Sequence, residues 1–225
     1  MRLDPFSFIC GNDELSPLLI THGLLGTSKN WSAITKKIRK RTDRTVVIFD
    51  ARNHGKSPWT LSLSYEGMVA DLRKLYDSLN LRKAILMGHS MGGRTLLGFA
   101  LVYPELVDKL ISVDISQIPL ERTKNIILDK YIYVEDSQGV SRWNVNIEAL
   151  GKDELRNIAE FPKQWIDLKS NVPVLFICGG KSRVSFKKKI MKRFKLNSLS
   201  QLLPIFLELV IGYMQKSQMS SQRLF

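Results

Sequence analysis

Five short apolar runs that alternate with helical patterns constrain the fold of this chain more than any other feature of its sequence. The runs are rich in β-branched residues and are bounded by turn signals, which is typical of buried strands. They cover residues 18–21, 45–50, 84–88, 110–114 and 172–178. Helical patterns lie between them at residues 31–40, 65–79 and 92–102. This order predicts an α/β fold, with a mostly parallel sheet covered by helices on both faces.

The length and composition favour one domain. A chain of 225 residues with 44% hydrophobic residues can enclose one sizeable core. No uncharged apolar stretch reaches the roughly 18 residues of a membrane span, and the first residues lack the pattern of a secretory signal. The two cysteines, Cys10 and Cys178, lack the spacing of a zinc site or a disulfide framework. We therefore expect a soluble intracellular protein.

A glycine-rich turn follows the third apolar run. It reads Gly88-His89-Ser90-Met91-Gly92 and stands between a predicted strand and a predicted helix. A sharp strand-to-helix turn needs glycine on both sides of the serine, because side chains there would collide. The following helix also favours negative charge at its N-terminus. We interpret Ser90 as a candidate nucleophile rather than as a solvated turn serine.

A second glycine-rich turn follows the first apolar run. It reads His22-Gly23-Leu24-Leu25-Gly26. Backbone amides in such a turn can stabilise an oxyanion above the serine, and the residue after the nucleophile contributes a second amide. We expect the amides of Leu24 and Met91 in that role. The side chain of His22 is interpreted as a brace of its own loop.

Four segments together resemble α/β-hydrolases of the group that contains the abhydrolase domain-containing protein 11 family and related bacterial esterases. They read LLITHGLLGTSKNWSAI, VVIFDARNHGKSP, AILMGHSMGGRTLL and PELVDKLISVDIS, and they span residues 18–116 in the family's order. RWNVNIEAL and PVLFICGGKS, further along, look like the region after the family's helical cap. The resemblance implies the α/β-hydrolase fold and a serine esterase site.

The resemblance also implies an acid at the end of the fourth predicted strand. Asp114 stands where bacterial esterases of this group hold the triad aspartate, and a carboxylate there would orient a base. The alternative is that Asp114 only caps a helix or a turn. Glu148 is a rival for the acid, because family members also carry an acid in the segment NVNIEAL.

No histidine follows Ser90 in this sequence. The triad of this fold runs in the order serine, acid, histidine, so the base is expected after the last strand. All three histidines, His22, His54 and His89, precede the serine. Neither His54 nor His89 fits a base that reaches Ser90 from the far side, although the sequence leaves His54 open. Because a serine hydroxyl without a base is a poor nucleophile, we expect weak or absent hydrolysis.

Positive charge is concentrated in residues 181–225, which carry +9 of the chain's net +13. We expect an incomplete hydrolase domain at 1–183, with a short cap at about 117–141, and a tail at 184–225 that does not resemble the family. The basic run 187–195 and the apolar run 202–214 could contact a membrane surface or a protein. The alternative is sequence that never packs as the family's C-terminus does. Nucleic-acid binding is not expected, because few aromatic residues are interleaved with the basic ones.

Two functions from different classes remain open at this point. The first is a serine hydrolase that cleaves small carboxylic esters through an acyl-enzyme, with Ser90 as nucleophile and Asp114 as acid. The second is a non-catalytic protein that binds an acyl ligand or regulates a partner. No phosphate loop or set of metal ligands appears, so no cofactor is expected. The resemblance implies a mitochondrial location, while the missing targeting stretch leaves a cytoplasmic one open.

Overall fold

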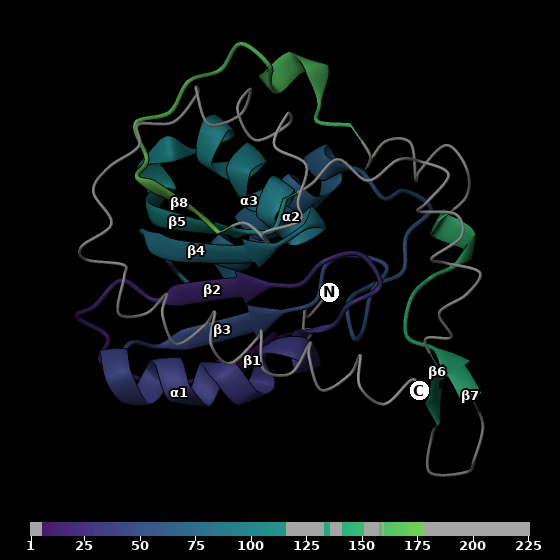
Figure 1. The fold of residues 1–225 in the computed structure, drawn as a ribbon, viewed down its shortest axis with the longest axis horizontal. Helices are drawn as coiled ribbons and strands as arrows, with labels where there is room; N and C mark the ends of the chain where they lie inside the picture. Colours follow the sequence, from purple (N-terminus) through teal and green to yellow (C-terminus); the bar gives the residue numbers. More distant parts are fainter. Residues whose placement is uncertain (1–5, 116–132, 136–140, 151–157, 159, 178–225) are drawn as a thin grey trace.

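A six-stranded sheet in the order β1-β3-β2-β4-β5-β8 forms the centre of the molecule (Figure 1). The computed structural model describes residues 6–115, 133–135, 141–150, 158 and 160–177. The strands are β1 (Phe6–Ile9), β2 (Leu18–Thr21), β3 (Val46–Phe49), β4 (Ala84–His89), β5 (Val107–Val113) and β8 (Val174–Ile177). Only β1 runs antiparallel to its neighbour, and the other pairs in this sheet are parallel. A hairpin of β6 (Tyr133–Glu135) and β7 (Ser141–Trp143) forms a separate two-stranded sheet.

Helices cover both faces of the large sheet (Figure 1). α1 (Ser32–Thr42) packs on one face, and α2 (Tyr65–Ser78) and α3 (Met91–Val102) pack on the other. Short 3₁₀ helices are η1 (Ser28–Trp31), η2 (Pro104–Leu106), η3 (Glu148–Leu150) and η4 (Lys163–Trp165). No helix among the described residues is long and apolar enough to cross a membrane.

The core is split by the sheet into two clusters. Leu19 and Leu86 belong to the cluster that includes the buried side chains of α2 and α3, whereas Ile20 and Met87 pack in the cluster of Ile38 from α1. Neighbouring residues of a strand point to opposite faces of the sheet, so both faces of a fully covered strand must be apolar. This explains why the central strands read as continuous apolar runs.

The predicted α/β fold is confirmed, with differences at the edges. β1 was not predicted, because this four-residue edge strand carries a half-exposed Phe8 and no continuous apolar run. β5 begins at Val107 rather than at residue 110, since Asp108 and Lys109 interrupt the apolar pattern. The predictions for the tail at 184–225, for Cys178 and for most of the cap at about 117–141 fall outside the described residues.

Candidate active site

Ser90 lies at the sharp junction between β4 and α3. Its backbone has φ 50° and ψ −114°, a left-handed conformation that costs a non-glycine residue about 1–3 kcal/mol. Two hydrogen bonds hold it, one from the Ser90 amide to the carbonyl of Val113 at 2.9 Å and one from the Arg94 amide to the Ser90 carbonyl at 3.0 Å. The serine is half-buried, so the turn presents it at the carboxyl edge of the sheet.

The glycines of the turn are required by close contacts. A Cβ at Gly88 would lie 2.7 Å from the backbone of Gly92 and Gly93, at the start of α3. A Cβ at Gly92 would collide with the carbonyl oxygen of His22. Without side chains at these two positions, α3 can pack closely against both β4 and the loop after β2, as the strand-turn-helix pattern predicted.

Asp114 follows β5 at the same edge of the sheet. Its amide donates to the carbonyl of Ile177 on β8 at 2.7 Å, and its φ is 46°. Burial lowers the pKa of His89, and the negative charge of Asp114 partly raises it again, so the two side chains interact across β4 and β5. The structure therefore brings Ser90, His89 and Asp114 together. Glu148 begins η3, on a segment that packs elsewhere against the loop after β3.

The loop after β2 lies directly beside the serine. A Cβ at Gly23 would stand 3.2 Å from the Cβ of Ser90 and 2.7 Å from Nδ1 of His89. In the described part of the chain, the amides of Leu24 and Met91 make no hydrogen bond, whereas the amide of Leu25 donates to His54. Met91 is the first residue of α3, so its amide has no partner within the helix. Neither of the two amides is therefore engaged by the described residues.

His22 is buried and neutral. Its Nδ1 donates to the carbonyl of Gly23 at 2.8 Å, and its Nε2 accepts the amide of Ala51 at 3.1 Å. Because Nε2 accepts a hydrogen bond, its 3.7 Å approach to Asp50 is not an ion pair. Burial lowers the pKa of His22, which agrees with the neutral form. The interpretation of His22 as a brace is supported by these contacts.

His54 is engaged in the same way. Its Nδ1 donates to the carbonyl of Arg52 at 2.9 Å, and its Nε2 accepts the amide of Leu25 at 3.2 Å. Burial, with the nearby His22, lowers its pKa to about 3. With both ring nitrogens bound to the backbone, His54 has no free nitrogen to take a proton from Ser90. The possibility that the sequence left open is therefore closed in this structure.

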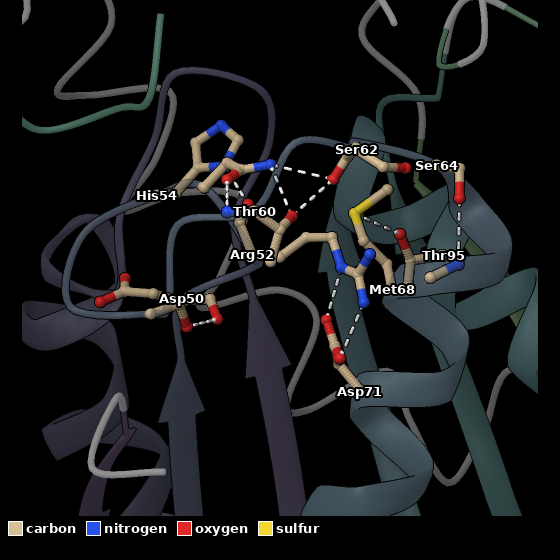
Figure 2. Close-up of polar contacts among 12 residues, drawn as sticks. Asp50, Arg52, His54, Thr60, Ser62, Ser64, Met68, Asp71 and Thr95 are labelled. Carbon is tan, nitrogen blue, oxygen red and sulfur yellow. Dashed lines mark hydrogen bonds and ion pairs between the residues drawn. The ribbon is translucent and has the colours of Figure 1, made fainter. Parts of the chain in front are cut away.

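The loop after β3 holds polar contacts that the motifs did not predict. The carboxylate of Asp50 accepts the amides of Ser28 at 2.6 Å and Lys56 at 2.9 Å, so it fixes the start of this loop. Figure 2 shows Arg52 reaching from the loop to Asp71 of α2, with two hydrogen bonds of 2.6 and 2.9 Å. The sequence signal that could have indicated these contacts was Asp50, the acidic residue directly after β3.

Asn53 joins this loop to a segment far along the chain. Its carbonyl accepts the amide of Asn146 at 2.8 Å, and its side chain binds Thr60 and Ser62. Asn146 returns a side-chain hydrogen bond to Asn53 at 3.3 Å. The segment that resembles the region after the family's cap is thus fixed onto the loop after β3.

A cavity of about 80 Å³ lies under the loop after β3, between the sheet and α2. Its walls include Phe49, Met68, Leu72 and Thr95. Neither Ser90 nor Asp114 is among the residues that line it.

Comparison with known proteins places the chain in a family. A model described as the alpha/beta hydrolase fold matches residues 16–136. The "sn-1-specific diacylglycerol lipase ABHD11" of Danio rerio is 31% identical over 210 residues, which cover 76% of this chain and 65% of that protein. The chain therefore spans less than two thirds of this relative. "Esterase YbfF" of Escherichia coli is 32% identical over 46% of this chain and 40% of its own length.

Solved structures agree with this assignment. A structure described as "Marine microorganism esterase" superposes with a TM-score of 0.72 at 26% identity, covering 94% of this chain and 99% of its own. The strand order, the serine at the turn between β4 and α3 and the matching family model lead to one conclusion. The chain belongs to the alpha/beta hydrolase fold family.

Proposed function

We propose that this chain is a serine hydrolase of small carboxylic esters, with Ser90 as nucleophile. The observation that carries the proposal is the positive φ of Ser90 beside Gly23, together with amides of Leu24 and Met91 that make no hydrogen bond to the described residues. Ser90 Oγ would form a bond to the acyl carbon and lose its hydroxyl proton, while the ester C–O bond breaks and the alcohol leaves with that proton. Water would then release the acid and regenerate the serine. Both amides would stabilise the oxyanion of each step.

The rate of ester hydrolysis is expected to be low, because none of the three histidines of this chain is placed to act as the base for Ser90. His22 and His54 are neutral and bound at both nitrogens, and His89 is positioned by the turn itself. Without the base, an oxyanion hole still gives a residual acceleration of about 10³–10⁴ over the reaction in water. Asp114 is proposed as the acid of the site, since it lies at the same sheet edge as Ser90.

A fluorophosphonate probe tests this proposal directly. The 225-residue chain should be labelled slowly, and mapping of the labelled peptide should identify Ser90. Ser90→Ala should remove the label, whereas Ser78→Ala, at an exposed serine at the end of α2, should keep it. Folded chain that takes no label at any probe concentration contradicts the proposal.

One observation favours a second candidate, a non-catalytic protein that binds an acyl ligand. Both ring nitrogens of His22 and of His54 are hydrogen-bonded to backbone groups, so neither histidine can accept a proton from Ser90. Turnover of a p-nitrophenyl ester that disappears in Ser90→Ala would exclude this candidate. Binding of a fatty acid without any turnover would favour it.

A further inference from the structure

Two buried imidazoles tie the loop after β2 to the loop after β3 in a reciprocal way. His22 stands on the first loop and accepts the amide of Ala51 from the second. His54 stands on the second loop and accepts the amide of Leu25 from the first. The two rings lie 5.1 Å apart between their centroids, and both side chains are almost fully buried. We call this pair the histidine clasp.

Each ring also binds the backbone of its own loop. Nδ1 of His22 donates to the carbonyl of Gly23, and Nδ1 of His54 donates to the carbonyl of Arg52. A carbonyl only accepts and an amide only donates, so both rings carry their proton on Nδ1 and leave Nε2 bare. The arrangement is possible only for two neutral imidazoles of this one tautomer.

The clasp brackets Leu24 in the sequence. The carbonyl of the preceding residue, Gly23, is held by His22, and the amide of the following residue, Leu25, is held by His54. Leu25 adopts φ 63°, which a leucine does not hold without support. A turn bond from the Gly26 amide to the Gly23 carbonyl at 2.9 Å closes the loop. The peptide of Leu24 is thus fixed on both sides.

We propose that His22 and His54 are positioning residues, whose reciprocal hydrogen bonds hold the Leu24 amide next to Ser90. This inference rests on the proposed ester hydrolysis for its catalytic meaning, but the clasp itself is a property of the two loops. The clasp is linked to the reaction by the close approach of Gly23 to the serine, since a Cβ added at Gly23 would lie 3.2 Å from the Cβ of Ser90. A shift of this loop would move the amide away from the oxyanion, and small misplacements of such groups cost large factors in rate.

A matched pair of substitutions at His54 separates the two hydrogen bonds. His54→Gln places an amide oxygen where Nε2 stands and keeps an acceptor for Leu25, whereas His54→Asn keeps a donor near Nδ1 and loses that acceptor. Hydrogen exchange, measured by mass spectrometry on the 225-residue chain, should show the peptide over residues 22–27 exchanging at least about tenfold faster in His54→Asn. In His54→Gln the exchange rate of this peptide should stay close to its rate in the chain without substitutions.

Ser90 labelling provides the second measurement. The rate of fluorophosphonate labelling should fall at least about tenfold in His54→Asn and recover in His54→Gln. Equal exchange and equal labelling in all three proteins would overturn the positioning role, and so would equal losses in both variants. Should the unchanged chain not be labelled, the proposed ester hydrolysis fails, and the exchange contrast alone decides whether the clasp holds the loop. If His54→Asn does not fold, the pair His22→Asn and His22→Gln tests the bond to Ala51 by the same contrast.

Discussion

The amide of Ser90 donates a hydrogen bond to the carbonyl of Val113 at 2.9 Å, which ties the serine to the strand that ends one residue before Asp114. In the register of the sheet, His89 stands opposite Val113. The serine, the histidine before it and the acid therefore lie together because β4 and β5 are parallel neighbours, and parallel strands end at the same edge.

This arrangement predicts the effect of Asp114 on His89. Asp114→Asn removes the negative charge that partly offsets burial, so it should lower the pKa of His89 further. A titration of the His89 ring signals by NMR measures the change. Asp108→Asn, at the opposite end of β5, is the matched control and should leave that pKa in place. An unchanged His89 titration in Asp114→Asn would contradict the proposed contact.

The histidine clasp predicts a loss of stability in mild acid. His54 has a pKa of about 3 in the folded chain, below its ordinary 6.5, and the pKa of His22 is shifted in the same direction. Burial dominates both shifts, His89 lowers the pKa of His22, and the charge of Asp50 opposes the shift of both. Below pH 6.5 the unfolded chain therefore binds protons that the folded chain does not. Between pH 7.5 and pH 5, His54 should lower the free energy of unfolding by about 2 kcal/mol, and His22 should lower it further in the same direction.

Urea denaturation at pH 7.5 and pH 5 measures this loss. The variant His54→Gln lacks one titrating ring, so its stability should fall less between the two conditions. An equal fall in His54→Gln and in the unchanged chain would show that other groups cause the acid sensitivity.

The tight turn at Ser90 predicts unequal costs for two glycine substitutions. Gly88→Ala places a Cβ 2.7 Å from the backbone that begins α3, which cannot move without opening the turn. It should cost about 2–3 kcal/mol of unfolding free energy and remove the labelling of Ser90. A Cβ at Gly67 would meet only the guanidinium end of Arg52, which can move. The higher helix propensity of alanine should also stabilise α2 by about 1 kcal/mol in Gly67→Ala. In thermal unfolding, Gly67→Ala should have a clearly higher midpoint temperature than Gly88→Ala.

The left-handed Asn53 predicts that glycine is a better replacement than alanine. Both substitutions lose the hydrogen bonds to Thr60 and Ser62, but only alanine must adopt φ 64° with a Cβ. Asn53→Ala should therefore be less stable than Asn53→Gly by about 1 kcal/mol. Chemical denaturation of the two variants gives the difference, and equal stability would show that the strain is relieved in the variant.

The ion pair of Arg52 and Asp71 predicts a measurable coupling between the loop after β3 and α2. The pair is bidentate, and its side chains are 17% and 36% exposed, so solvent screens it only in part. A double-mutant cycle of Arg52→Ala and Asp71→Ala should give a coupling free energy of about 1 kcal/mol. Raising the salt concentration should reduce that value, and additive single effects would mean that the pair contributes nothing to stability.

Local sequence patterns determined much of this protein. The apolar runs fixed the central strands, because strands covered on both faces must be apolar on both sides. The glycines around Ser90 indicated the turn, because no other residue fits that crossing of strand and helix. The strand β1 was not predicted from the sequence, because an edge strand with one exposed face has too weak a hydrophobic pattern.

Only the tertiary structure decided which groups the two buried histidines bind. In the sequence, His22 and His54 are separate motif residues: His22 was interpreted as a brace of its own loop, and His54 was left open as a base. Their roles are set by four backbone groups contributed by two loops, and hydrogen bonds between such loops depend on how β2 and β3 pair rather than on neighbouring residues. Burial in that contact also fixes their neutral form, because a charged ring there would lose its water without gaining an acceptor.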